Sequence, residues 1–417
     1  MRALRWTASA AIAGALFLIT LEMGLRLLPQ AIPLSVLLRF DPDLRSAIAA
    51  RRDLARYADT IPVARDDGGP PDPMWLYRPG STVRSADGED GIVPAVRADA
   101  MGFCNTDTDA YRAAHFDVFA VGDSFTWCTP VEPQDAWPAR LQTLTGLSAY
   151  NAGAPARGLH EYVQILERFG LAKTPDFVVL AVYEGNDLRD AYRFHAWRAD
   201  AGREDREPVC AFSSARICRI LADLDASWLC RHSYACNLAT GGARQLAEKA
   251  RKREIDFRYD VSFPDGVVLA FNSANGDQDE LEFARWLVAG QLGPELFDDA
   301  LRKLVALGEA HGFVPVVVYI PSSATSYAGM SRFEDPAIER TLERYSEILR
   351  EYFAAQAAEL GYAYVDTTPA LKAANARLPA ARGLYFRTNV HLTPAGHAIV
   401  AEEVARRIEA LRHSSRG

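Results

Sequence analysis

The chain has 417 residues, with 46 Lys and Arg against 54 Asp and Glu, which gives a formal net charge of −8. This acidic balance argues against a nucleic-acid partner, because binding the phosphate backbone needs clustered positive charge. Hydrophobic residues make up 49% of the chain and charged residues 24%, a composition that supports a packed core and excludes wholesale disorder.

The amino terminus combines two arginines with an apolar stretch. Arg2 and Arg5 precede an uncharged segment at 6–21, and no small-residue cleavage site follows it. We therefore expect residues 1–29 to form an uncleaved signal anchor, a single transmembrane helix with its arginines in the cytoplasm and the rest of the chain exported. The alternatives are a cleaved signal peptide and an amphipathic helix that packs on the folded domain.

The middle of the chain changes from a mixed pattern to a regular one. Residues 30–110 contain Pro and Gly clusters and are interpreted as a tether and an irregular lead-in. Over 111–190 and 294–417, short apolar runs alternate with helical patterns, which indicates an α/β fold whose parallel sheet is covered on both faces. The expected strands are 117–121, 147–150, 177–183, 313–320 and 362–365, and the expected helices are 134–145, 159–169, 294–311, 336–360 and 394–412.

The segment 191–293 interrupts this alternation and is interpreted as an insertion or cap. It contains four of the six cysteines, and none of them forms a CxxC pair. Zinc sites have tighter ligand spacing, so we expect disulfides in an oxidising compartment, with a connectivity that the sequence leaves open; buried free thiols are the alternative. These cysteines are Cys210, Cys218, Cys230 and Cys236.

A serine follows the first expected strand of the sheet. Ser124 lies in the sequence Gly122-Asp123-Ser124-Phe125, where a strand ends and a helix opens. Folds of this class bind ligands at the carboxyl ends of their strands. A helix amino terminus there supplies free N–H groups and positive potential to an oxyanion. The alternative is that Asp123 and Ser124 only cap a helix.

Three further residues lie at later element boundaries. Gly153 follows a short strand and can present its backbone N–H, and Asn186 follows the next strand and can present its amide. His391 lies just before the last helix. A Ser, two neutral donors and a His in this arrangement form a hydrolytic constellation. His391 and His397 have no convergent third ligand, so neither a metal nor a cofactor is expected.

In order and context, these four residues match the four blocks of the SGNH (GDSL-like) hydrolases, and the chain resembles that family over roughly 200 residues. The resemblance implies a flavodoxin-like, three-layer α/β/α core with a parallel sheet, interrupted by the cysteine-containing insertion. It also implies that Ser124 is the nucleophile and His391 the base. The oxyanion hole would consist of the Ser124 N–H, the Gly153 N–H and the Asn186 amide.

Other details resemble the membrane-anchored bacterial branch that is associated with envelope and exopolysaccharide modification. They are the tethered start, the segment Arg97…Gly102-Phe103 and the ending HLTPAGH at 391–397. This branch implies an inner-membrane protein with its catalytic domain in the periplasm. It implies an esterase that removes acyl groups, above all acetyl, from an envelope carbohydrate or a small ester. An O-acetyltransferase with the same acyl-Ser and a carbohydrate-binding or assembly protein are the alternatives.

The sequence departs from the family pattern beside the histidine. The family has an Asp two or three residues before the His, but here those positions are Asn389 and Thr388. Asn389 can orient His391 through its carbonyl oxygen but carries no charge, which predicts a weakened or dyad-type enzyme. Asp366 is a possible substitute acid, but we expect it to end a strand and cap the next segment.

Two cysteines lie in segments that the resemblance brings together near the sheet. Cys104 follows Phe103 in the lead-in, and Cys128 follows Trp127 shortly after the expected nucleophile. We expect a Cys104–Cys128 disulfide; the alternative is two unrelated buried thiols.

Overall fold

The computed structural model describes residues 2–32, 60–62, 75–84, 94–199, 227–255, 257–272 and 277–414, together with positions 36, 40, 44, 48, 223 and 224. The chain divides into two compact units. Met1–Asp59 and Arg206–Glu254 form one, here called the helical unit; Thr60–Asp205 and Ile255–Gly417 form the other, here called the sheet unit. The segment 191–293 contributes to both units.

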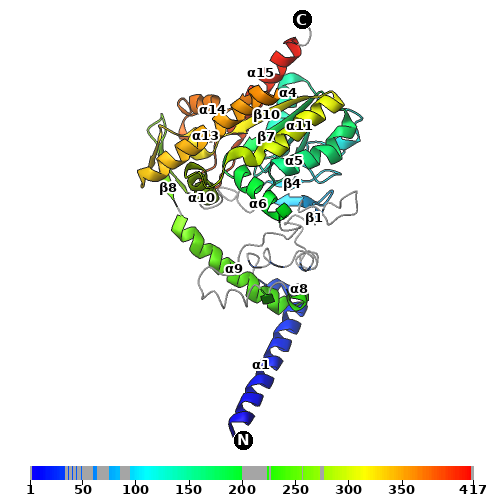
Figure 1. Ribbon diagram of the computed structural model, residues 1–417, viewed down its shortest axis with the longest axis vertical. Helices are drawn as coiled ribbons and strands as arrows, with labels where there is room; N and C mark the ends of the chain where they lie inside the picture. Colours follow the sequence, from blue (N-terminus) through cyan, green and yellow to red (C-terminus); the bar gives the residue numbers. More distant parts are fainter. Residues whose placement is uncertain are drawn as a thin grey trace. The chain divides into compact units, whose positions relative to one another are not determined.

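A parallel sheet of five strands forms the centre of the sheet unit (Figure 1). Its spatial order is β12-β10-β7-β5-β6, with every neighbouring pair parallel. Numbered along the chain, this is the flavodoxin-like order 2-1-3-4-5. The α/β fold that the sequence predicts is therefore confirmed. The strands are β5 (Val118–Gly122), β6 (Ala149–Gly153), β7 (Phe177–Tyr183), β10 (Val314–Ile320) and β12 (Ala363–Asp366).

Helices cover both faces of this sheet. On one face α4 (Trp137–Thr145) packs against α15 (Pro394–Ser414); on the other, α11 (Asp298–His311) packs against α5 (Leu159–Ile165) and α13 (Pro336–Leu360) (Figure 1). Right-handed crossovers between the parallel strands produce this distribution. The remaining α-helices described in the sheet unit are α6 (Asp187–Ala199), α10 (Asp277–Val288), α12 (Ser323–Ser326) and α14 (Thr368–Asn375).

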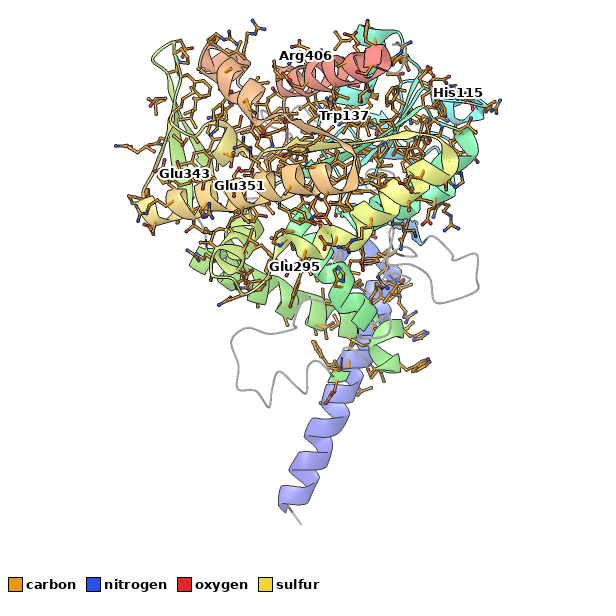
Figure 2. The ribbon with its side chains drawn as sticks, turned by 45° about the horizontal axis from the view of Figure 1, so that its top comes forward. His115, Trp137, Glu295, Glu343, Glu351 and Arg406 are labelled. Atoms are coloured by element: carbon orange, nitrogen blue, oxygen red, sulfur yellow. A yellow bond between two sulfur atoms is a disulfide. The ribbon has the colours of Figure 1, made fainter. Side chains whose placement is uncertain are left out.

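The longest of these helices, α13, has clear local signals at both ends. The Asp335 side chain accepts a hydrogen bond from the Ala337 N–H at 2.8 Å, and Gly361 ends the helix with a φ of 84°. One side of α13 is buried, and Glu343 and Glu351 lie on its exposed side (Figure 2). An amphipathic helix of this kind is stabilised mainly by the packing of its apolar face.

Small antiparallel sheets accompany the main sheet. Three strands pair in the order β11-β8-β9, with β8 (Arg258–Ser262), β9 (Val268–Asn272) and β11 (Ser331–Phe333). Two pairs lie in the lead-in: β1 (Thr60–Pro62) with β2 (Trp75–Tyr77), and β3 (Thr82–Arg84) with β4 (Ala95–Arg97).

The helical unit contains α1 (Arg2–Leu27), α8 (Trp228–His232) and α9 (Tyr234–Ile255). The Glu22 carboxylate accepts hydrogen bonds from the Ala235 N–H and the Ser233 hydroxyl, both at 2.9 Å, and so caps the start of α9. A disulfide joins Cys230 to Cys236. The other two cysteines of the predicted insertion, Cys210 and Cys218, lie outside the described residues.

Residues 1–29 were expected to cross a membrane. Among the residues that the structure describes, no helix is both long enough and apolar enough to cross a membrane. The expected transmembrane helix is therefore not supported.

Candidate active site

Ser124 and His391 meet at the carboxyl end of the sheet. Ser124 lies in the turn that follows β5, and His391 lies in the loop before α15. The distance from Ser124 Oγ to His391 Nε2 is 2.7 Å, so the two side chains are hydrogen-bonded. β5 lies between β6 and β7, where the strand order reverses, and this is the position at which doubly wound sheets bind ligands.

Asn389 is hydrogen-bonded to the other ring nitrogen of His391. Its Oδ1 accepts a short hydrogen bond from His391 Nδ1 and a second one from the His391 N–H at 3.0 Å. A hydrogen on Nδ1 leaves the lone pair of Nε2 directed at Ser124, which is the tautomer that a general base needs. Asn389 is buried, so water does not compete for this bond.

Asp366 does not replace the missing acid. One of its carboxylate oxygens accepts from Arg350 at 2.7 Å, and the other accepts from the Thr368 N–H at 2.9 Å. These contacts end β12 and cap α14, which agrees with the expectation for this residue.

An aromatic ring packs on the imidazole of His391. The Phe125 ring stacks on it at a centroid distance of 4.9 Å and on the Tyr183 ring at 3.7 Å. Burial lowers the pKa of His391 to about 3, because the imidazolium loses its hydration. The ring is therefore neutral, and able to accept the Ser124 proton, at any pH well above 3.

The Ser124 N–H and the Asn186 amide, two of the expected oxyanion donors, have different surroundings. Among the described residues, no acceptor takes the Ser124 N–H. Asn186 donates one amide hydrogen to Asp190 Oδ2 at 2.8 Å, and its side chain also interacts with the buried Asp123 carboxyl. Asp190 Oδ1 in turn accepts a hydrogen bond from Arg189 Nε at 2.8 Å, so the carboxylate that orients the Asn186 amide is itself held in place.

Gly153 has a different environment from the one that the family resemblance implies. Its N–H donates to Asn151 Oδ1 at 2.9 Å and is therefore already used within the protein. A Cβ at this position would lie 2.3 Å from the Trp127 nitrogen and 2.7 Å from the Thr126 carbonyl carbon. Gly153 thus lets the end of β6 approach the turn that carries Ser124.

Buried carboxyl groups lie behind the site. Asp123 Oδ1 accepts the Phe125 N–H at 2.8 Å and shapes the turn, as the sequence suggests. Burial, with a further contribution from Asp190, raises the pKa of Asp123 to about 7. Burial also raises the pKa of Glu161 to about 7 and that of Asp187 well above its ordinary value. In the sequence, only the position of Asp187 directly after Asn186 indicates a role for these carboxyl groups near the site.

Neither His397 nor the possible metal ligands belong to the site. His397 is fully buried, and its Nδ1 accepts the N–H of Trp137 at 3.3 Å. Trp137 lies within the sheet unit (Figure 2). Within the described part of the chain, the only converging set of candidate ligands is His115, Asp117 and Asp176, whose ligand atoms lie within 4.8 Å of one another. The set lies at the amino ends of β5 and β7, at the opposite edge of the sheet from Ser124.

The two cysteines that are predicted to pair near the site lie beside the turn that carries Ser124. A disulfide joins Cys104 in the lead-in to Cys128, four residues after Ser124. The structure therefore brings together the two cysteines that the sequence expects to pair.

The chain was compared with protein families and solved structures. The model of the GDSL-like Lipase/Acylhydrolase family matches residues 120–399. A putative lipolytic protein of the G-D-S-L family from Desulfitobacterium hafniense is similar in structure at 15% identity, with a TM-score of 0.32, over 70% of this chain and 98% of that one. A variant of an acetyl xylan esterase from Geobacillus stearothermophilus shows 15% identity and a TM-score of 0.36, over 71% of this chain and 95% of that one. No curated protein matches the sequence significantly.

The family match includes Ser124, Gly153, Asn186 and His391 and extends over more than half of the chain. The chain belongs to the GDSL-like lipase/acylhydrolase family.

Proposed function

We propose that the sheet unit is a serine esterase in which Ser124 is the nucleophile and His391 the general base. The observation that carries this proposal is the 2.7 Å contact between Ser124 Oγ and His391 Nε2, at the carboxyl end of β5. Membership of the acylhydrolase family supports ester chemistry at this site.

The first half of the reaction forms an acyl-enzyme. Ser124 Oγ attacks the acyl carbonyl carbon while His391 Nε2 takes the hydroxyl proton. The Ser124 N–H and the Asn186 amide donate to the oxyanion. The bond from the acyl carbon to the leaving oxygen then breaks, and His391 returns its proton to that oxygen, which releases the alcohol.

The second half returns the enzyme to its starting state. A water molecule gives a proton to His391 and attacks the acyl-Ser, and the same two donors hold the new oxyanion. The bond to Ser124 Oγ breaks, Oγ recovers the proton from His391, and the carboxylic acid is released.

For the substrate we propose an O-acetylated envelope carbohydrate, and for the compartment an oxidising one such as the periplasm. The substrate class rests on the resemblance to the envelope-modifying branch. The compartment is supported by the disulfides Cys104–Cys128 and Cys230–Cys236, which persist under oxidising conditions.

Reaction with a fluorophosphonate probe tests the nucleophile. The wild-type protein should be labelled on the peptide that contains Ser124, and Ser124→Ala should abolish labelling. Ser331→Ala is the matched control, because that buried hydroxyl has no hydrogen-bond partner within the described structure and lies on β11. A wild-type protein that stays unlabelled would contradict the proposal and favour a binding or assembly protein.

The fate of the acyl group separates hydrolysis from transfer. Incubation with an acetylated oligosaccharide and a second, unacetylated one should release free acetate. Acetylation of the second oligosaccharide in place of acetate release would identify an O-acetyltransferase.

A further inference from the structure

A loop of the lead-in lies against the strand next to the nucleophile. Asp99 is fully buried and organises this loop by accepting the Met101 N–H at 2.8 Å and the Phe103 N–H at 2.9 Å. It also accepts the Tyr150 hydroxyl at 2.6 Å, which ties the loop to β6. A fourth hydrogen bond to Asp99, from Asn105 Nδ2 at 2.9 Å, fixes the side chain of Asn105.

The Asn105 amide pairs with the backbone of β6. Its Oδ1 accepts the Asn151 N–H at 2.9 Å, and its Nδ2 donates to the Asn151 carbonyl at 3.0 Å. β6 is the edge strand of the parallel sheet, so its outer backbone groups have no strand partner there. Asn105 thus takes the place of a neighbouring strand at a single residue and fixes the position of Asn151.

Asn151 in turn connects β6 to the turn that carries Ser124. Its Nδ2 donates to the Thr126 carbonyl at 2.7 Å, and its Oδ1 accepts the Gly153 N–H at 2.9 Å. Asn151 is only 3% exposed, so both bonds are shielded from water. Without this side chain, a buried carbonyl and a buried N–H would lose their partners.

The disulfide reinforces the same connection. Cys104 precedes Asn105, and Cys128 lies two residues after Thr126. A covalent link and a chain of amide hydrogen bonds therefore join the same two segments, the lead-in loop and the Ser124 turn.

We propose that Asn151, oriented by Asn105, is a positioning residue for Ser124: it fixes the 124–127 turn so that Oγ stays on His391 and the Ser124 N–H stays directed at the acyl oxygen. This inference rests on the proposed esterase function. It assigns no proton transfer or substrate contact to either asparagine. Misplacing a nucleophile by about 1 Å can slow a reaction about 100-fold, so a positioning residue acts mainly on kcat.

Asn151→Ala tests the inference. We expect kcat on an acetyl ester and the rate of fluorophosphonate labelling to fall about 10- to 100-fold, with little change in KM. Asn105→Ala leaves the Asn151 side chain in place but removes both hydrogen bonds to the Asn151 backbone, so a smaller fall in kcat is expected. If Asn151→Ala fails to fold, Asn105→Ala decides, and a kcat equal to that of the wild type would overturn the inference.

Asn375→Ala is the matched control. Asn375 is also buried in the sheet unit, and its Nδ2 donates to the Ser326 carbonyl at 3.1 Å and the Ser326 hydroxyl at 2.9 Å. This variant should lose stability but keep the kcat of the wild type. Equal kcat values for the Asn151→Ala and Asn375→Ala proteins would mean that Asn151 is only structural.

Hydrogen exchange separates this inference from the proposed function. The N–H groups of Thr126 and Trp127 both donate to the Asp123 carbonyl within the turn. They should exchange faster in Asn151→Ala than in the wild type or in Asn375→Ala, whether or not the protein is an esterase. Unchanged exchange would refute the positioning role, whereas an unlabelled wild-type protein with faster exchange in the variant would refute only the esterase.

Discussion

His391 contacts a hydroxyl on one ring nitrogen and an uncharged amide on the other. Asn389 supplies the orientation that an Asp gives in a charged triad, but it supplies no negative charge to stabilise the imidazolium. Burial against Phe125 further disfavours the charged ring, and the pKa of His391 falls to about 3. At residue scale the site therefore keeps its base in the active form and lacks stabilisation of the cation that forms during catalysis.

Asn389→Asp tests whether the missing negative charge beside His391 limits catalysis. A carboxylate on Nδ1 should stabilise the imidazolium and raise kcat on an acetyl ester about tenfold, because an opposite charge at hydrogen-bond distance favours the charged ring by roughly one pKa unit or more. It should also raise the pKa of His391. Below this pKa His391 is protonated and cannot accept the Ser124 proton, so the acidic limb of the kcat/KM profile should move to higher pH. Steady-state kinetics from pH 3 to 9 measures both effects, and unchanged or lower kcat would contradict the role assigned to the missing acid.

Contacts between elements hold the site together. The carboxyl ends of β5 and β6 approach closely because Gly153 has no side chain beside Trp127. Behind the sheet, the buried His397 of α15 accepts the Trp137 N–H at the start of α4, so one imidazole joins two helices of the same face. Burial, with smaller contributions from His391 and Arg140, lowers the pKa of His397 to about 3.

This contact between α4 and α15 predicts a pH-dependent stability. In the folded protein His397 is protonated only near pH 3, whereas in the unfolded chain it is protonated near pH 6.5. The contribution of neutral His397 to the free energy of unfolding is therefore complete above pH 6.5 and falls as the pH decreases toward 3. Between pH 7 and pH 5, the wild type should lose about 2 kcal/mol more than His397→Leu, in which the titrating group is absent. Denaturant unfolding at both pH values measures the difference. Parallel losses in the two proteins would show that His397 does not titrate as expected.

At the scale of the whole molecule, the two described disulfides lie in different units. Cys104–Cys128 belongs to the sheet unit with Ser124 and His391, and Cys230–Cys236 belongs to the helical unit. Their sequence separations are 24 and 6 residues. From loop-closure entropy alone, Cys104–Cys128 should stabilise the folded protein by about 3 kcal/mol and Cys230–Cys236 by about 2 kcal/mol.

Serine substitution of each pair should therefore have different effects. Cys230→Ser with Cys236→Ser should destabilise the helical unit and leave kcat/KM on an acetyl ester unchanged. Cys104→Ser with Cys128→Ser should destabilise the sheet unit and lower kcat, because the Ser124 turn loses its covalent link. Thermal unfolding and acetate release measure the two properties, and an equal loss of activity in both double variants would contradict this assignment.

Local patterns predicted most elements of the sheet unit because each depends on residues close in sequence. β7 is the expected strand at 177–183, and α13 is the expected helix at 336–360, where an Asp cap and a terminal Gly mark its ends. Other boundaries differ from the expected ones: α4 begins at Trp137, after a short 3₁₀ turn, and not at 134. The β11-β8-β9 sheet is not among the expected elements. Its β11–β8 pairing joins 331–333 to 259–261, and pairing between segments so far apart in the chain leaves no local signal.

Composition, periodicity and motif are enough to establish the α/β class, the identity of the residues at the strand ends and the absence of an Asp beside His391. The connection between β6 and the Ser124 turn follows only from how the strands pack. Gly153 donates its N–H to Asn151 within β6, and the Asn151 side chain reaches the Thr126 carbonyl because β5 and β6 are neighbours in the sheet. The chemistry is therefore carried by residues that the motifs identify, while their alignment depends on packing between segments that no local pattern connects.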